Sequence, residues 1–408
     1  TDYQIPVMST PVGGYALNSL QDYMGLPIEV DIEDINSLPF RCYQLCWNEW
    51  YRDENLQDSV IVDTGDGPDL STNYGLLKRG KRHDYFTSCL PWPQKGDAVS
   101  LPLGTSADVS FDGVGSQYLT VKDQNNNSNT MYLTGGSIAS QGAGLEYEKL
   151  YANLEDATAA TINQLREAFQ VQRLYERDAR GGTRYTEIVK SHFGVTSPDA
   201  RLQRPEYLGG GSSSIQISPI AQTSSTDATT PQGNLSGVGT VGMNGHGFTK
   251  SFTEHGYIIG LASVRADLTY QKGINRMWTR QTRWDFYWPG LAHLGEQAVL
   301  SKELYADGSV NDQDVFGYQE RFAEYRYKQS NITGLFRSDA AQSLDAWHLS
   351  QDFTTRPVLD DTFIEENPPF DRVIAVPSEP HIIFDAYFNY KCARPMPTYG
   401  VPGMIDHF

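Results

Sequence analysis

Two long stretches rich in glycine, serine, threonine and asparagine interrupt this chain of 408 residues, and they limit what it can fold into more than any other feature. The first runs from Asp97 to Gly144 and contains only brief strand-like pieces, Gln117 to Val121 and Thr130 to Leu133. The second runs from Gly209 to Gly256 and lacks helical periodicity. We interpret the first as an insertion, and the second as an ordered loop or extended arm that something outside the chain holds in place.

Outside these stretches the sequence favours β-structure. Its 37 glycines, 21 prolines and 24 tyrosines are typical of strands joined by turns. Apolar and polar residues alternate from Val264 to Tyr270, from Phe384 to Cys392 and, more weakly, from Arg321 to Lys328, so each segment is predicted to be a strand. Because long excursions join these strands, we expect an antiparallel sandwich or jelly roll. The length is compatible with one large domain or with two.

Two segments show helical periodicity instead. Between Leu38 and Gln57, Trp47, Trp50 and Tyr51 recur at spacings of three and four, which predicts a short amphipathic helix. A longer helix is predicted over residues 153–180, with Asn153 as its N-cap and the glycine pair that follows Arg180 as its end.

The charge of the chain limits its partners. Lysine and arginine number 32 against 50 aspartates and glutamates, a formal net charge of -18, which argues against nucleic-acid affinity spread over the whole surface. A local basic patch remains compatible with this balance. No apolar run approaches the ~20 residues of a membrane span, and Thr1 to Pro11 lacks the regions of a signal peptide. We expect a soluble, non-secreted protein without membrane insertion.

The sequence predicts no catalytic or cofactor-binding residue. Gly237, Gly239 and Gly242 form a G-x-G-x-x-G pattern, but no predicted strand precedes it. The acidic pairs Asp360-Asp361 and Glu365-Glu366 are interpreted as solvated surface, because fifty acidic residues produce such neighbours by chance.

No metal site is predicted either. The eight histidines never occur at the i, i+4 spacing of a metalloprotease helix, and no Gly-x-Ser-x-Gly elbow is present. The four cysteines lack the spacing of a structural zinc site and are expected to be free, mostly buried thiols. They are Cys42, Cys46, Cys89 and Cys392.

One basic cluster is dense enough to bind nucleic acid. Four cations lie close together in a segment that also carries aromatic residues, and this combination holds single strands by charge and stacking. Pairing of the same cations with acidic neighbours at an interface is the alternative. The cluster consists of Lys78, Arg79, Lys81 and Arg82.

A second cluster combines tryptophan with arginine. These two residue types are enriched in buried protein contacts, so subunit packing is favoured here over a ligand site. The predicted interface residues are Trp278, Arg283, Trp284 and Trp288.

Long, idiosyncratic segments identify a known family. The sequence resembles the major capsid proteins of the gokushovirus branch of the Microviridae over almost its whole length. The segments that carry this resemblance are WNEWYRDENLQ (47–57), LLKRGKRHDYFTSCLPWPQKG (76–96), RLYERDARGGTRYTEIVKSHFGV (173–195), RWDFYWPGLAHLGEQAV (283–299) and CARPMPTYGVPGMIDHF (392–408).

The resemblance implies a mainly β protein, an eight-stranded antiparallel viral jelly roll with long loop insertions and a few helices. It also implies a structural, non-enzymatic subunit of a T = 1 icosahedral shell of about sixty copies around circular single-stranded DNA. The implied partners are the DNA, a small basic DNA-binding protein and a pilot protein of the same virus, and a receptor on the host cell. The implied location is the virion, assembled in the cytoplasm of a bacterial host.

The resemblance also implies a division of the chain. Residues 1–96 are expected to contribute part of the jelly roll, residues 97–150 a surface protrusion that contacts the host, and residues 151–408 the remaining strands and inter-subunit loops. The family's first barrel strands are expected upstream of Thr1, so this chain is not expected to close the barrel alone. The competing interpretation is a β-sandwich that binds carbohydrate or resembles a glycoside hydrolase, which would require a convergent cleft.

Overall fold

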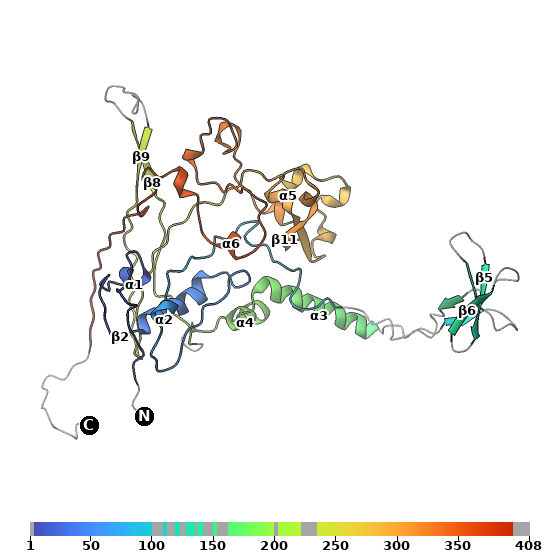
Figure 1. Ribbon diagram of the computed structural model, residues 1–408, viewed down its shortest axis with the longest axis horizontal. Helices are drawn as coiled ribbons and strands as arrows, with labels where there is room; N and C mark the ends of the chain where they lie inside the picture. Colours follow the sequence, from blue (N-terminus) through green and yellow to red (C-terminus); the bar gives the residue numbers. More distant parts are fainter. Residues whose placement is uncertain are drawn as a thin grey trace, which may run out of the picture. The chain divides into compact units, whose positions relative to one another are not determined.

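The computed structural model describes residues 4–99, 109–111, 119–122, 128–134, 137–141, 150–152, 162–199, 203–221 and 235–394 (Figure 1). The chain divides into two compact units. The first comprises residues 1–264, 272–329 and 353–366, and the second comprises residues 265–271, 330–352 and 367–408. Among the described residues, no helix is long and apolar enough to cross a membrane.

The predicted short helix is confirmed. It consists of α2, Leu38–Cys46, and a single π-helical segment, Trp47–Tyr51, that continues it. A proline in its first turn suits the helix start, where the missing N–H has no intrahelical partner in any case. Phe40, Tyr43 and Trp47 lie at spacings of three and four and are buried, so they form the face that packs into the core.

The longer predicted helix is confirmed in its second part. It appears as α3, Ile162–Gly181, while the predicted N-cap, Asn153, lies outside the described residues. The helix ends where Gly182 takes a φ of 92°, a left-handed conformation that glycine adopts without strain. The remaining α-helices are α1 (Leu20–Tyr23), α4 (Tyr185–Phe193), α5 (Ser301–Leu304) and α6 (Asp361–Ile364).

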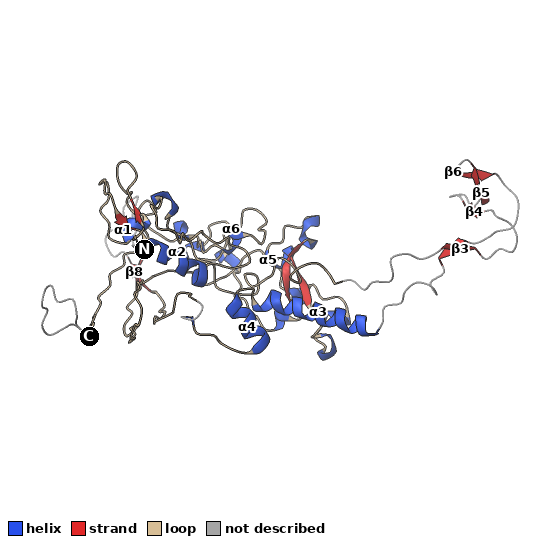
Figure 2. Ribbon diagram, turned by 90° about the horizontal axis from the view of Figure 1, so that it is seen from below, coloured by secondary structure: helices blue, strands red, loops and turns tan. Residues whose placement is uncertain are grey.

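The described strands form five small antiparallel sheets (Figure 2). Two strand-like pieces predicted in the insertion are confirmed as β4 and β5, and the second glycine-rich stretch contains the pair β8 and β9. The sheets are β1 (Val7–Met8) with β2 (Ile35–Asn36), β3 (Val109–Phe111) with β7 (Leu150–Ala152), β4 (Leu119–Lys122) with β5 (Ser128–Thr134) and β6 (Ser137–Gln141), β8 (Gln216–Ala221) with β9 (Leu235–Thr240), and β10 (Glu296–Leu300) with β11 (Val315–Glu320).

Three predicted strands are wrong. Residues 264–270 and 384–392 belong to no strand; only Tyr270 forms isolated bridges, with Asn331 and Gln351. Within residues 321–328, Phe322 takes a φ of 65°, which interrupts the alternation and starts a 3-10 turn. A strand needs a ladder partner as well as alternation, and the described residues supply none to these segments. The eight-stranded jelly roll is therefore not formed by the described residues.

One core of the first unit includes residues of α1 and α2. Its buried members are Met8, Tyr15, Leu20, Phe40, Tyr43 and Tyr74. A buried ion pair between Arg41 on α2 and Asp69 adjoins this core at Tyr74. The Asp69 carboxylate accepts hydrogen bonds from Nε and Nη2 of Arg41, at 2.8 and 2.5 Å, and a short one from the Tyr74 hydroxyl. The Arg41 guanidinium thereby holds the pKa of Asp69 well below its usual range.

Asp69→Asn is expected to lower the free energy of unfolding by about 3 kcal/mol or more, because it leaves the Arg41 charge buried without its counter-ion. Asp63→Asn is the matched control, since Asp63 lies 4.0 Å from the same guanidinium but its side chain is 57% exposed. Urea unfolding at neutral pH measures both variants. Because the pKa of Asp69 is lowered, its contribution is lost only as the pH falls below ~3.9. Equal midpoints for the two variants would contradict the expectation.

A second core of the first unit surrounds the hairpin of β10 and β11. The segment before Leu90 lies against β11, where Leu90 and Tyr318 exchange backbone hydrogen bonds of 2.9 and 2.8 Å. Gly317 permits this approach, since a Cβ there would lie 2.8 Å from atoms of Cys89 and Leu359. Phe316 then stacks edge-on against Phe86 and Phe363, so β11 joins the 85–90 segment to α6.

Candidate assembly and nucleic-acid surfaces

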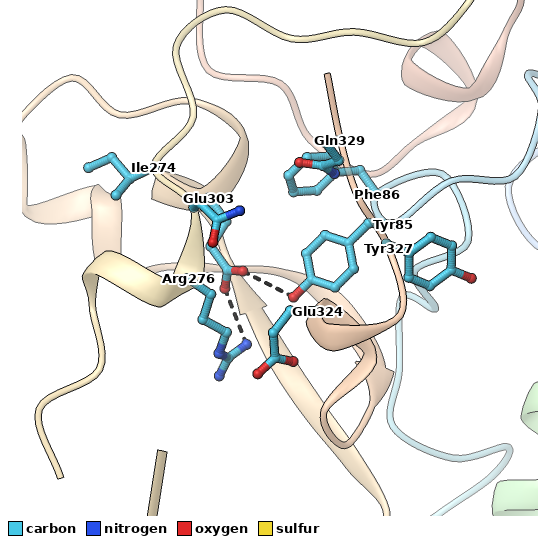
Figure 3. A pocket seen from close by; sticks show the side chains of 9 residues that line it. Tyr85, Phe86, Ile274, Arg276, Glu303, Glu324, Tyr327 and Gln329 are labelled. Atoms are coloured by element: carbon cyan, nitrogen blue, oxygen red, sulfur yellow. Dashed lines mark hydrogen bonds and ion pairs between the residues drawn. The ribbon is translucent and has the colours of Figure 1, made fainter. Parts of the chain in front are cut away.

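A buried carboxylate fixes the segment that carries the exposed tryptophans. Glu303 on α5 accepts hydrogen bonds from the Tyr85 hydroxyl at 3.0 Å and from Nη1 of Arg276 at 3.2 Å (Figure 3). Burial raises the pKa of both Glu303 and Tyr85. The adjoining cavity measures about 20 Å³, which is room for one water. This arrangement is therefore a structural anchor, too small to hold a substrate.

The anchored segment presents its aromatic side chains to solvent. It consists of three 3-10 turns, Arg276–Trp278, Arg283–Asp285 and Pro289–Leu291. We call its exposed aromatic residues the tryptophan surface. They are Trp278, Trp284, Phe286, Tyr287 and Trp288, with exposed fractions of 75%, 50%, 52%, 52% and 45%.

Local contacts order this surface. The rings of Trp284 and Trp288 lie 6.2 Å apart, and the guanidinium of Arg283 lies 4.1 Å from the centroid of the Trp284 ring. The Trp288 indole donates a hydrogen bond of 2.8 Å to the Arg283 carbonyl, and Arg321 donates one of 3.2 Å to the Trp284 carbonyl. Three of the four predicted interface residues thus form one ordered aromatic and cationic group, and Trp278 belongs to the same segment.

The basic cluster splits into inward and outward residues. Lys81 is 7% exposed, and its ammonium donates a hydrogen bond of 2.6 Å to the Phe363 carbonyl. It also lies 4.8 Å from the centroid of the Phe363 ring, and burial lowers the pKa of Lys81. In this subunit Lys81 therefore ties the cluster to α6. Lys78 and Arg82 are exposed, and Arg79 is half-buried.

Acidic neighbours accompany this cluster. Nζ of Lys78 lies 3.7 Å from the Glu365 carboxylate, as the alternative interpretation of the cluster expects. Arg79 stacks on the Tyr51 ring and donates a hydrogen bond of 2.8 Å to the Ser263 hydroxyl. The Asp360 carboxylate accepts a hydrogen bond of 2.9 Å from the Phe363 amide and so caps α6. Asp360 and Asp361 are exposed, as their interpretation as solvated surface expects. For the second pair that interpretation is wrong at Glu366, which is buried at 8% exposure, while Glu365 is half-buried.

The other chemical patterns lie on ordinary structure. Gly237 and Gly239 belong to β9, which pairs with β8. Among the described residues, no group of three or more histidine, cysteine, aspartate or glutamate side chains is placed to hold a metal ion. The cysteines were expected to be mostly buried, but only Cys89 is; Cys42 and Cys46 are half-buried and Cys392 is exposed.

Comparisons with known proteins agree with this picture of a structural chain. The model of the family described as capsid protein (F protein) matches residues 1–404. Capsid protein VP1 of Bdellovibrio phage phiMH2K is 49% identical over 427 residues, which cover 100% of this chain and 80% of that protein. The VP1 proteins of Chlamydia phage 1 and Spiroplasma virus 4 are 43% and 37% identical, over 99% and 98% of this chain and 80% and 79% of their own lengths. This chain therefore belongs to the phage F capsid protein family, which confirms the resemblance carried by its sequence and makes it a major capsid protein.

Proposed function

We propose that this chain assembles into a T = 1 icosahedral shell of about sixty copies that encloses circular single-stranded DNA. The observation that carries the proposal is the tryptophan surface, where five large aromatic side chains remain exposed on an ordered support. Aromatic residues and arginine in such a group are the residues that dominate protein interfaces. Trp278, Trp284 and Trp288, with Arg283, are accordingly proposed to contact a neighbouring subunit.

The arm, residues 209–256, supports the same proposal. Its described apolar side chains face solvent along an extended backbone, an arrangement that is costly unless another surface covers them. We propose that neighbouring copies cover the arm in the shell. The exposed apolar residues of the arm are Ile215, Ile217, Ile220, Val238, Val241, Met243, Phe248 and Phe252.

The shell is tested by the mass of the native particle. Sedimentation of particles purified from infected host cells is expected to give a protein mass roughly sixty times that of one chain, with DNA protected from nuclease. Dissociated chains in the same buffer are the control. A chain that sediments only as a monomer or small oligomer would contradict the proposal.

The genome needs local positive charge, since a subunit with a net charge of -18 repels DNA overall. We propose that Lys78, Arg79 and Arg82 face the DNA, and that Lys81 supports them by anchoring their segment on α6. These side chains are few, so a small basic protein of the same virus is expected to neutralise most of the packaged charge. A pilot protein and a host receptor complete the proposed set of partners.

The proposed architecture remains a jelly roll with a host-contacting protrusion. Its support is the family membership. We propose that residues 97–150 form the protrusion, inserted between jelly-roll parts in residues 1–96 and 151–408. Virions are proposed to assemble in the cytoplasm of a bacterial host, and no enzymatic activity is proposed for the chain.

A further inference from the structure

A second, larger cavity lies beside the Glu303 anchor, between the segment that carries the tryptophan surface and the hairpin of β10 and β11. Its volume is about 180 Å³, far above the ~10–15 Å³ that one water requires. Side chains with four positive and three negative charges line it. The charged lining residues are Arg276, Arg280, Lys302 and Arg321, and Asp285, Glu303 and Glu324.

All three carboxylates of this lining already have partners. Glu303 pairs with Arg276, and the Glu324 carboxylate lies 3.5 Å from Nη2 of Arg280. The Asp285 carboxylate accepts hydrogen bonds of 3.0 and 2.8 Å from the backbone amides of Gln281 and Thr282. No carboxylate of the lining is therefore without a partner.

The other two cations have neutral partners within the part of the chain that the structure describes. Nη2 of Arg321 donates a hydrogen bond of 3.2 Å to the Trp284 carbonyl. Nζ of Lys302 donates one of 3.2 Å to the side-chain oxygen of Gln313. Four cations and three carboxylates give the lining a net charge of about +1, although the whole chain has a net charge of -18.

Two donors at the cavity also lack acceptors. Nε of Arg280 and Nε of Arg321 are buried and have no hydrogen-bond partner among the described residues. The Arg280 guanidinium is held in place by the rings of Tyr325 and Phe286, whose centroids lie 4.3 and 5.4 Å away. A buried donor without an acceptor is costly, so these oriented guanidinium groups favour an acceptor that enters the cavity.

We propose that this cavity binds a phosphate group. Arginine side chains present their N–H donors in a planar fork that matches phosphate oxygens. The net charge of about +1 is neutralised by the single negative charge of a phosphodiester, which favours the backbone of single-stranded DNA over inorganic phosphate. The DNA source rests on the proposed packaging of a genome, whereas phosphate binding itself concerns only the side chains of one subunit.

Binding of two probes to the dissociated full-length subunit tests the proposal. The probes are a short oligothymidylate and inorganic phosphate, titrated by calorimetry at low and moderate salt. Arg321→Gln is expected to weaken oligothymidylate binding about tenfold. It is also expected to reduce the salt dependence by about 0.7 in the logarithmic slope, as expected for one lost single-strand phosphate contact. Arg326→Gln is the matched control, because Arg326 lies on the same segment but pairs with Glu320 outside the lining.

A second readout separates binding from folding. Each probe that occupies the cavity is expected to raise the unfolding temperature of the wild-type subunit and of Arg326→Gln, but not that of Arg321→Gln. If Arg321→Gln does not fold, Lys302→Gln is tested in its place. If inorganic phosphate raises the unfolding temperature and oligothymidylate does not, the cavity binds phosphate, and its ligand is free phosphate and not DNA.

The proposal is overturned if neither probe binds the wild-type subunit, or if Arg321→Gln and Arg326→Gln behave alike. DNA as the ligand of the cavity is also excluded if Arg321→Gln still binds oligothymidylate but the double variant Lys78→Gln/Arg82→Gln does not. In that case the DNA binds at the basic cluster. Probe binding is measured on dissociated subunits. Its result therefore does not depend on whether the proposed shell assembles or packages a genome.

Discussion

Trp284→Ala is expected to reduce the yield of intact particles by more than about tenfold, while the subunit stays soluble and folded. Half of the Trp284 side chain is exposed, so its loss removes little from the core of the subunit. A tryptophan buried at an interface commonly contributes about 2 kcal/mol or more to the free energy of association. In a closed shell the same subunit contact recurs in every copy, so the loss is repeated at each one. Particle yield on a sucrose gradient, relative to soluble subunit, measures the effect.

The rest of the tryptophan surface is expected to stay in place in Trp284→Ala, so a lower particle yield would report the loss of this one side chain. The hydrogen bond from Arg321 reaches the Trp284 carbonyl, a backbone atom that alanine retains. Trp347→Ala is the control, since Trp347 is 62% exposed but lies outside the tryptophan surface. Normal particle yield from Trp284→Ala and Trp288→Ala would show that these residues serve another purpose than subunit contact.

The helices were predictable because their signals are local. In α2 the buried Phe40 and Tyr43 lie within one turn, and Gly182 ends α3 through its own backbone freedom. Strands depend on partners that lie far away in the sequence. Residues 384–392 alternate as strictly as a strand, yet alternation states which face is apolar and not which segment pairs with it.

The basic cluster illustrates the same limit at a site. Lys78 and Lys81 are three residues apart and look equivalent in sequence, but Lys81 is buried by a contact with Phe363, 282 residues later. The anchor of Tyr85 on Glu303 spans 218 residues. The pKa of Glu187 is raised to about 7, first by burial and then by Glu54, a pairing for which the sequence has no signal. Burial and long-range pairing decide these roles, and both require the fold.

The described strands between residues 109 and 152 pair only with one another. The end strands of the insertion, β3 and β7, pair directly, with Val109 opposite Ala152, while β4, β5 and β6 form a sheet of their own between them. Opposed residues in an antiparallel pair lie ~5 Å apart, so a short Gly-Ser linker can replace everything from one to the other. Residues 97–144 contain four aspartates and one lysine among many small polar residues, a composition that favours exposure to water over burial.

Replacing residues 109–152 with such a linker is expected to give assembled, DNA-filled particles that adsorb to host cells about 100-fold more slowly. Assembly is expected to be retained because the linker joins points that are already neighbours. Adsorption is expected to fall because the proposed protrusions, many on one particle, would bind a cell together and gain avidity of ~10²–10⁴-fold. A rigid scaffold commonly carries recognition on insertions of this kind. Adsorption is measured as the loss of free particles after mixing with host cells.

A smaller replacement, of residues 119–141 only, removes the sheet of β4, β5 and β6 and keeps the pair of β3 and β7. If the receptor contact lies on the sheet of β4, β5 and β6, both variants adsorb equally slowly. If it lies on the pair of β3 and β7, the smaller replacement adsorbs normally. DNA content and sedimentation of the particles serve as controls for assembly. Failure of both variants to assemble would make the insertion part of the shell itself, and normal adsorption of both would place the host contact on another surface.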